Sequence, residues 1–404
     1  MMLMELPTSL LHLILGFVVP KTLVSSTSGL SKEQTELCLV TKKWKIHTFV
    51  QSLMYSHERD SVNVQQVINQ FQNLQKLMLN FNSTKKRKPE EKLEHLDLIV
   101  PKKVHTFCLR NCRKHQLDLT CHNNNLLHLE MNNLSWKPND YLFGNLRHLT
   151  LEKCVELHWL SLLFMPLLEY LECSYCLELH TISDIPPSIR TLVLMHCPLL
   201  AALEPVPQKL VCLWSTSALS HLFADIEEVS EYFLALLDQE VENVPKKIQL
   251  LTLVGFDEKI SANKLPFLPS RPLRSLKFQN VLTNDDGSVF KIYAQLCPSS
   301  LEGLHISMKS CIDFFDFSTF KHCSQLRVII LENILAFSGS INVSLIFPCL
   351  RRIRLVFRTS DGTYITFVWR KGFSPLRYNK LPKNCSQLDK ILYDSIKNQI
   401  KIFI

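Results

Sequence analysis

Cysteine and histidine are the residues of this chain whose spacing could carry chemistry. The stretch CSYC leaves two residues between Cys173 and Cys176, a spacing found in thiol redox centres and zinc sites. His128 and His148 stand 20 residues apart, so a repeat of that length would set them side by side like a pair of metal ligands. No third ligand follows at a regular offset. Whether either pair does chemistry therefore depends on the elements that position it.

One pattern recurs along the chain: an apolar residue, two residues, a second apolar residue, one residue, and a third apolar residue. About 13 matches begin at Leu74, Leu93, Val104, Leu126, Leu146, Leu168, Ile189, Leu210, Ile248, Leu273, Leu301, Leu326 and Leu350. From Leu126 to Leu210 the starts lie 20, 22, 21 and 21 residues apart, and from Ile248 to Leu350 they lie 25, 28, 25 and 24 apart. The second and third apolar residues alternate on a short strand and face the core. One such unit cannot bury its own apolar face, so the units must stack.

A turn residue marks several repeats, because Asn or Cys stands eight positions after the first apolar residue. These residues are Asn82, Cys112, Cys154, Cys176 and Cys197. We expect each to lie where the chain turns and to pack or bond against the neighbouring turn. The repeat thus explains both cysteines of CSYC, one as an inward strand position and one as the turn position, and it disfavours redox or zinc chemistry. The 14 cysteines of the chain are then small buried apolar residues in a reducing compartment.

The whole pattern, L-x-x-L-x-L-x-x-[NC], resembles the leucine-rich repeat at its usual period. Together with helical apolar spacing at the two ends of the chain, this pattern predicts a mixed α/β fold. The expected parts are a small helical domain over 1–60, a curved solenoid with a parallel concave sheet over 61–380, and a C-terminal capping helix over 381–404. The longer late repeats leave room for a helix on the convex side, whereas the shorter central ones use extended or 3₁₀ segments.

A long irregular segment, 216–247, interrupts the array. We expect a helix in it over DIEEVSEYFLALLDQE, because five apolar residues fall on one helical face. These are Ile226, Val229, Phe233, Leu236 and Leu237.

The N-terminal stretch LPTSLLHLILGFVV has two interpretations. A secretory signal needs a positive n-region, but Glu5 is the only charged side chain before Leu6, and Pro7 and His12 interrupt the apolar run. Four possible glycosylation sequons, at Asn82, Asn133, Asn342 and Asn384, are compatible with secretion. Pro7 instead suits the first turn of a helix, followed by an apolar stripe. The helical interpretation is favoured.

With LCLVTKKW behind it, the stretch resembles an F-box over roughly residues 3–55: L-P-x-x-L-L-x-x-I-L, a longer gap than usual, then L-x-L-V-x-K-x-W. An F-box followed by leucine-rich repeats is a known domain order. The resemblance implies a substrate receptor of an SCF-type cullin–RING ubiquitin ligase. The F-box would dock on the Skp-family linker protein, and through it on the cullin and RING subunits, while the repeats hold an unknown substrate protein. It implies that the linker-binding residues are Leu6, Pro7, Leu10, Leu11, Ile14, Leu15, Leu39, Val40 and Trp44.

The residues that flank the second apolar position of each repeat should face the concave side in two columns, about 4.8 Å apart from strand to strand. From these columns we predict the substrate-binding residues Glu130, His148, Tyr170, Glu172, Trp214, Lys277, His305, Arg352 and Arg354. Asp97 and His95 would extend the columns in an early repeat. Carboxylates lie early and basic residues late, which suits a partner of opposite polarity. A solvated surface with no selected pattern is the alternative.

The composition argues against several other classes. The formal net charge of +8 over 404 residues is too mild to indicate a nucleic-acid binder. No G-x-G-x-x-G or G-x-x-x-x-G-K loop is present, and no apolar run approaches the roughly 18 residues of a membrane span. No catalytic triad, Cys–His pair or carboxylate pair can be assigned to one site. We therefore expect a protein that is not an enzyme, with no catalytic residue, cofactor, metal, bound nucleic acid or membrane partner.

Two alternative functions and one question about a basic run stay open. The chain could be an F-box scaffold outside ubiquitination, such as a kinetochore-type assembly component, or a secreted repeat protein. The basic run at 85–88 suits either a nuclear localisation signal or a solvated loop. We expect a cytoplasmic and/or nuclear location.

Overall fold

The computed structural model describes residues 22–26, 52–57, 68–69, 73–81, 94–112, 115–120, 125–134, 143–236, 241, 243–255, 265, 268, 273–281, 289–312, 315–334, 346–358, 364–371, 373–378 and 394. The chain divides into two compact units, Met1–Pro207 and Gln208–Ile404. Each unit is built around a parallel sheet, which we call its main sheet.

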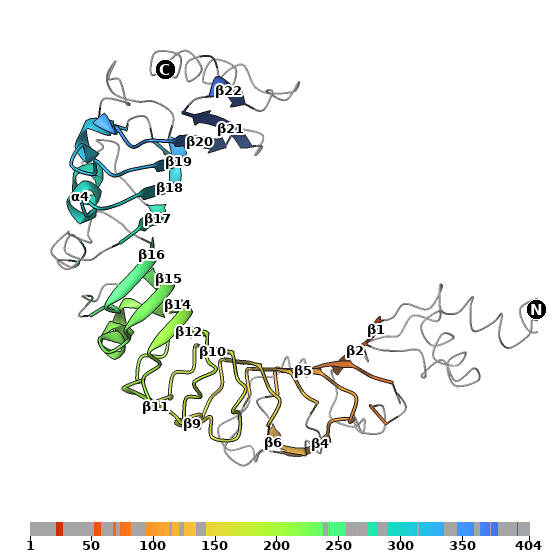
Figure 1. Ribbon diagram of the computed structural model, residues 1–404. Helices are drawn as coiled ribbons and strands as arrows, with labels where there is room; N and C mark the ends of the chain where they lie inside the picture. The colour runs from red at the N-terminus through yellow and green to blue at the C-terminus, as the bar shows by residue number, and fades with distance from the viewer. Residues whose placement is uncertain are drawn as a thin grey trace, which may run out of the picture. The chain divides into compact units, whose positions relative to one another are not determined.

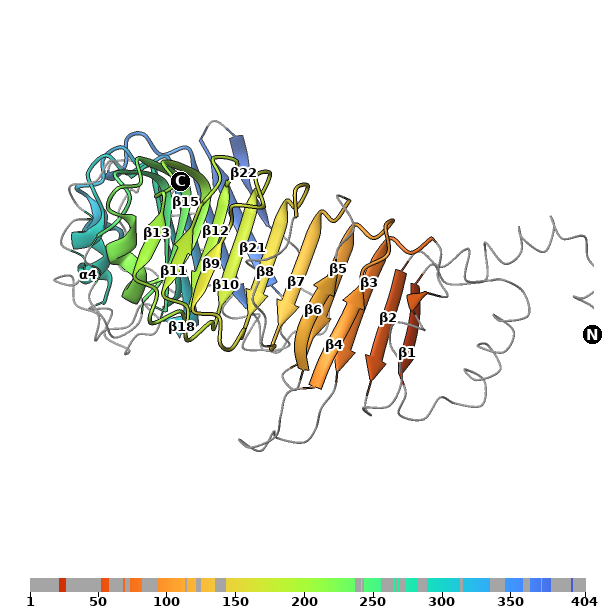
Figure 2. The same ribbon diagram turned by 90° about the horizontal axis from the view of Figure 1, so that it is seen from below.

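The main sheet of the first unit stacks one strand per repeat, side by side in chain order (Figure 2). Its strands are β1 (Thr22–Ser26), β2 (Ser52–His57), β3 (Lys76–Phe81), β5 (Thr106–Arg110), β7 (His128–Asn132), β8 (His148–Glu152), β10 (Tyr170–Ser174) and β12 (Thr191–Met195). The register aligns the second apolar residue of each repeat, from Leu53 through Leu171 to Leu192, and all of these are buried. The repeat read from the sequence therefore sets both the strands and their alignment.

A second layer faces the main sheet of the first unit across the core (Figure 1). Its short strands β9 (Trp159–Ser161), β11 (Thr181–Ser183) and β13 (Ala202–Glu204) pair with one another in parallel. Further toward the N-terminus, β4 (Glu94–Ile99) pairs with β6 (His115–Thr120) in a separate sheet. The extended return segments expected for short repeats are confirmed in the central repeats.

Each central repeat of the first unit turns a corner directly after its main-sheet strand. The corner residues adopt positive φ angles of 52° to 59° and are Asn111, Asn133, Lys153, Tyr175 and His196. In the first four of these corners the N–H donates to the next repeat, as where Lys153 N donates to Ser174 O at 2.8 Å. The corners thus add a hydrogen bond between neighbouring repeats, beyond the sheet itself.

A buried cysteine follows four of these five corners, and three of the four bond back to the preceding repeat. The thiol of Cys154 donates to Met131 O at 3.6 Å, that of Cys176 to Leu151 O at 3.5 Å, and that of Cys197 to Cys173 O at 3.4 Å. The predicted role of the turn cysteine is therefore confirmed in these three repeats. A thiol suits the position because it is small and apolar yet can satisfy a buried carbonyl.

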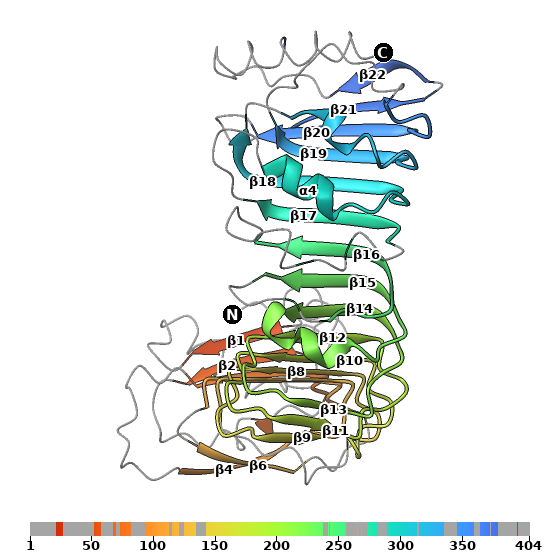
Figure 3. The same ribbon diagram turned by 90° about the vertical axis from the view of Figure 1, so that its left-hand side faces the viewer.

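The main sheet of the second unit runs in parallel from β14 to β20 (Figure 3). Its strands are β14 (Lys209–Thr216), β15 (Glu228–Ala235), β16 (Lys247–Val254), β17 (Ser275–Val281), β18 (Gly303–Ile312), β19 (Val328–Ile334) and β20 (Arg352–Arg358). β21 (Tyr364–Arg370) and β22 (Phe373–Tyr378) then pair antiparallel and end the described sheet. Among the residues that the structure describes, three helices with given bounds lie between these strands: the 3₁₀ helices η4 (Ser217–Phe223) and η7 (Phe317–Phe320), and α4 (Val289–Leu296).

Aromatic side chains fill the core between the sheet of the second unit and its helices. Phe278 of β17 stacks on Tyr293 of α4 with ring centroids 4.3 Å apart. Phe315 meets Phe290 at 4.9 Å and Phe320 at 5.6 Å. The longer late repeats therefore carry a helix, as expected, and large rings fill the wider space behind the sheet.

The predicted α/β fold class is wrong, because strands predominate in a parallel β-solenoid. In the described part of the chain, α4 is the one α-helix whose bounds can be given. Inside the predicted helical domain over 1–60, residues 22–26 and 52–57 are strands of the main sheet. Val50, Leu53 and Tyr55 in fact continue the repeat spacing, which the helical interpretation overlooked. The remainder of that segment and the capping helix over 381–404, apart from Asp394, lie outside the described residues.

The predicted helix within 216–247 is also wrong, because β15 occupies its centre. Val229, Tyr232 and Leu234 are buried at repeat spacing, and they divide the 38-residue gap from Leu210 to Ile248 into two repeats of 19 residues. Phe233 lies beside the inward residue Tyr232 and is also apolar, so Ile226, Val229 and Phe233 have the spacing of one helical face although the segment is a strand. His95 and Asp97 likewise do not join the predicted columns, because β4 pairs with β6 and not with the main sheet.

Candidate functional site

The predicted substrate-binding residues lie on main-sheet strands, in the two columns that flank the buried second apolar position. In the first unit Tyr170 pairs with His148, and Glu172 lies two strands from Glu130 in one column. In the second unit the column after the apolar position reads Trp214, Phe233, Thr252, Lys277, His305, Ile330 and Arg354. We call this outward side of each main sheet its open face; within the column of the second unit, Thr252 is itself buried between its neighbours. The columns are confirmed; the binding role stays a prediction.

A row of rings crosses the open face of the first unit. His128 and His148 stack with centroids 4.4 Å apart, and Tyr170 follows at 5.5 Å from His148. The side-by-side arrangement expected for the two histidines is therefore confirmed. Partial burial, with the neighbouring His148 and Lys76, lowers the pKa of His128, so its neutral form is favoured.

Three carboxylates lie beside this row, and each has a partner within the first unit. Glu130 accepts from Arg110 Nη2 at 2.6 Å, and Glu152 accepts from Lys153 Nζ at 2.8 Å. Glu172 accepts from the Tyr170 hydroxyl at 2.8 Å and from Ser174 Oγ at 3.1 Å. These bonds hold the carboxylates in place on the sheet, so the face is acidic and pre-arranged.

The open face of the second unit presents an aromatic pair, of which Trp214 is exposed and Phe233 half-buried. Trp214 of β14 stacks on Phe233 of β15, with centroids 4.2 Å apart and planes 24° from parallel. The indole Nε1 donates to Cys212 Sγ at 2.9 Å, which fixes the ring on its strand. Trp214 remains 40% exposed. A large fixed aromatic ring that stays open to solvent is typical of a protein-binding surface.

Basic residues follow the aromatic pair along the same face. Lys277 of β17, His305 of β18 and Arg354 of β20 share its column, and Arg352 lies in the neighbouring one. His305 Nε2 lies 3.2 Å from Glu332 Oε1. The contact with His305 holds the pKa of Glu332 at about 2, so this carboxylate is ionised and is engaged within the unit.

The CSYC stretch offers no open thiol pair. Cys173 and Cys176 are both fully buried, the first on the strand and the second at the turn. Burial also raises the pKa of Cys173 well above its ordinary value. Among the residues that the structure describes, no three His, Cys, Asp or Glu side chains gather as a metal site would require.

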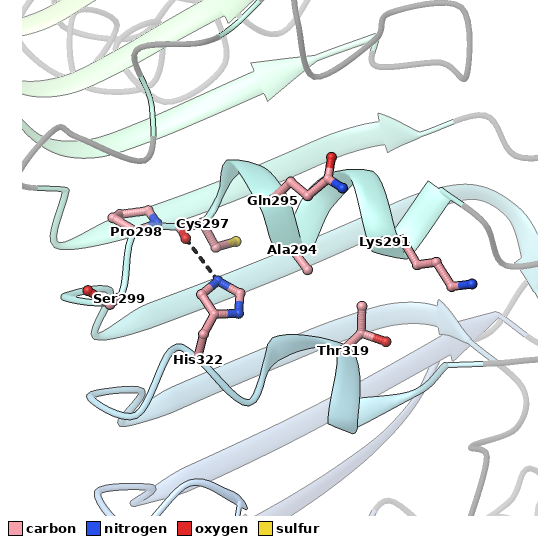
Figure 4. A pocket seen from close by; sticks show the side chains of 8 residues that line it. All are labelled: Lys291, Ala294, Gln295, Cys297, Pro298, Ser299, Thr319 and His322. Carbon is pink, nitrogen blue, oxygen red and sulfur yellow. Dashed lines mark hydrogen bonds between the residues drawn. The ribbon is translucent and has the colours of Figure 1, made fainter.

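A hollow lies beside α4 on the side away from the open face (Figure 4). Lys291, Thr319 and His322 contribute polar side chains to its lining. His322 Nε2 donates to Cys297 O at 3.0 Å, which fixes the ring. The described lining residues include no carboxylate.

Two residues that the sequence analysis did not select belong to the second face: Phe233 and Glu332. Phe233 was assigned to a predicted helix, although it directly follows the second apolar position of a repeat, Tyr232. Glu332 follows the third apolar position, and only the strand register places it beside His305. The predicted linker-binding residues, from Leu6 to Leu15 and from Leu39 to Trp44, lie outside the described residues.

The repeat spacing, the parallel register and the buried turn cysteines together define a solenoid of the leucine-rich-repeat type. No family model and no curated protein matches the chain. One solved structure that it resembles is the leucine-rich-repeat ectodomain of the plant membrane receptor kinase GASSHO1/SCHENGEN3 from Arabidopsis thaliana, in complex with CASPARIAN STRIP INTEGRITY FACTOR 2. The identity is 13% and the TM-score 0.26, over 77% of this chain and 42% of that one. The chain thus spans less than half the length of that ectodomain.

Proposed function

We propose that this protein is a non-catalytic binding protein that holds another protein on the open faces of its main sheets. The observation that carries the proposal is the exposed Trp214, stacked on the half-buried Phe233 of the next strand, with charged side chains beside the pair. A repeat sheet presents many side chains in a fixed pattern, which suits recognition of an extended surface. None of the described helices is long and apolar enough to cross a membrane.

The more specific role that we propose is substrate receptor of an SCF-type ubiquitin ligase. Its support is the F-box-like spacing of LPTSLLHLIL and LCLVTKKW ahead of leucine-rich repeats. In that role Leu10 and Leu11 would contribute to linker docking, and the repeats would hold substrate near a charged ubiquitin enzyme. The chemistry would come from proximity, which raises the effective concentration of substrate lysines. The free thiols of the ten described cysteines support placing the protein in the cytoplasm or nucleus.

Co-expression with a Skp-family linker protein tests the specific role. We expect a stable complex, and we expect Leu10→Asp with Leu11→Asp to abolish it. Leu163→Asp is the matched control, because Leu163 is 60% exposed within the repeats and should leave the complex intact. Absence of any complex would refute linker docking. A complex that never assembles with cullin would favour a scaffold role instead.

A further inference from the structure

We propose that the open face of the second unit binds an extended acidic peptide that carries one large apolar side chain as its anchor. The inference rests on the proposed protein-binding function and adds the chemistry of the partner. It does not depend on linker docking, because no residue of that stretch takes part.

The anchor site is the Trp214–Phe233 pair. Stacking and the bond to Cys212 fix the indole, so an incoming apolar side chain meets a ring that loses little conformational entropy on binding. Trp214 is 40% exposed, whereas its strand neighbours Leu213 and Ser215 are fully buried. Partner contact would remove this ring from water, which is the usual source of affinity at interface hot spots.

The acid-binding part lies farther along the column. Among the described residues, no ion pair engages Lys277, Arg352 or Arg354, whereas Glu332 is committed to His305. Arg352 Nε is buried and has no hydrogen-bond partner. That atom is not accessible to a partner, but Arg352 and Arg354 are only half-buried as whole residues, so a partner's carboxylate can pair with the accessible part of each side chain. Lys277, Arg352 and Arg354 therefore lie on one side of the aromatic pair and are available to bind acidic groups of a partner.

The strand spacing sets the spacing of the peptide. β17 lies two strands from β15, about 10 Å at ~4.8 Å per strand, and β20 lies five strands away, about 24 Å. An extended chain advances about 3.3 Å per residue. An anchor on Phe233 therefore places Lys277 about three residues away and Arg354 about seven residues away. The expected peptide has one apolar residue followed by acidic residues near the third and seventh positions, in one chain direction.

A single-stranded nucleic acid also combines rings with negative charge, but the face favours a peptide. Glu231 is exposed on β15 beside Cys212, and Glu332 lies within the basic region. These carboxylates would repel an evenly charged phosphate backbone. A peptide can instead place single carboxylates opposite Lys277 and Arg354 and uncharged residues opposite Glu231 and Glu332.

Fluorescence anisotropy of the full chain with labelled twelve-residue peptides tests the inference. The probes are a peptide with Leu as anchor and Asp at the third and seventh positions beyond it, the same peptide in reversed order, a scrambled version, and one with Lys in place of Asp. We expect one of the first two to bind at least tenfold more tightly than the scrambled and Lys peptides. Oligo(U) of similar length should bind more weakly than that peptide.

Variants then locate the site. Trp214→Ala and Lys277→Glu should each weaken binding of the acidic peptide about tenfold, with circular dichroism spectra like that of the original chain. Trp159→Ala is the matched control, because Trp159 is 48% exposed on the second layer of the first unit and should change nothing. Preference for the Lys peptide or oligo(U), equal binding of the scrambled peptide, no binding of either acidic peptide, or an equal effect of Trp159→Ala would overturn the inference. Linker co-purification is measured separately, so failure here is distinguishable from failure of the ligase role.

Discussion

The two units fill the space behind their main sheets with side chains of different size. In the central repeats of the first unit, the second layer is a short extended strand, and leucine and cysteine pack between the layers. In the second unit the repeats from Ile248 onward are longer, at 24 to 28 residues, and α4 and η7 bring in the rings of Phe290, Tyr293 and Phe320. The difference indicates that repeat length determines the thickness of the core, and that side-chain volume then has to match it to avoid cavities.

The open faces of the two units also differ. The first unit has a row of His and Tyr rings beside carboxylates that are already bonded within the unit. The second has an aromatic pair with Trp214 exposed, and basic side chains that no described ion pair engages. The first face is thus largely satisfied by its own contacts, whereas the second has unmet interactions. This contrast is why the peptide site is assigned to the second unit.

The largest test of the core comparison is Phe278→Ala. Loss of a buried ring that stacks on Tyr293 should lower the free energy of unfolding by about 3–5 kcal/mol. Leu171→Ala in the first unit should cost less, about 2–4 kcal/mol, because a smaller cavity results. Urea unfolding measures both, and Leu163→Ala at an exposed position should stay within about 0.5 kcal/mol. A smaller loss for Phe278→Ala than for Leu171→Ala would contradict the link between repeat length and core filling.

The turn cysteines give the second test, which is specific to the first unit. Cys176→Ala leaves Leu151 O without its donor and removes a buried sulfur, so we expect a loss of about 1–2 kcal/mol in urea unfolding. Cys349→Ala in the second unit is the control, because Cys349 is only half-buried and should cost little. Equal losses would mean that the turn thiol contributes nothing specific between repeats.

The third test concerns the charged face of the second unit. The folded-state pKa of Glu332 is about 2, against its ordinary value of 4.5, so its contribution to stability is present above pH 4.5 and is lost as the pH falls toward 2. Allowing for its partial exposure, the contribution is on the order of 1 kcal/mol. Glu332→Gln should flatten the fall in unfolding free energy over this range, and His305→Ala should do the same. Identical pH profiles for the original chain and Glu332→Gln would show that the His305 bond does not contribute to stability.

The smallest effect is expected at the corners. Lys153 holds a φ of 52°, which glycine adopts at lower cost, so Lys153→Gly should stabilise the first unit by up to about 1 kcal/mol. The exposed contact of its amine with Glu152 offsets little of this gain. Lys153→Ala loses the same side chain without the backbone freedom and is the control. A thermal melt in which both variants behave alike would show that the corner is not strained. In the second unit, Gly255 and Asn333 are the described residues with positive φ.

The sequence predicts those parts of the fold that the apolar spacing determines directly. The spacing of Leu171 and Cys173 predicts a strand, and the flanking Tyr170 and Glu172 lie in the predicted columns. The prediction of a helix around Phe233 failed because Ile226, Val229 and Phe233 also satisfy a helical period. The strand was hidden because Tyr232 fills an inward position in which aliphatic residues were expected. Spacing alone does not distinguish these two periods over so short a stretch.

The candidate sites were predictable only in part, for a related reason. Column membership follows from spacing, so Trp214 and Lys277 could be selected from the sequence. The contact of His305 with Glu332 spans 27 positions and depends on strand register, which no local pattern contains. The β4 strand shows the converse: LEHLDL has the right spacing but lies in a return segment, because β3 and β5 pair directly with each other.

The antiparallel strands at the end of the second unit have a consequence for polymerisation. A stack of like repeats exposes a strand edge on which a further copy could add, and repeated addition would build a filament. The β20–β21–β22 meander reverses the chain direction, so the repeat geometry stops there. Pro375 within β22 also lacks the N–H that a docking strand would need. The meander therefore ends the run of parallel repeats in the described part of the chain and makes β22 a poor edge for end-to-end growth.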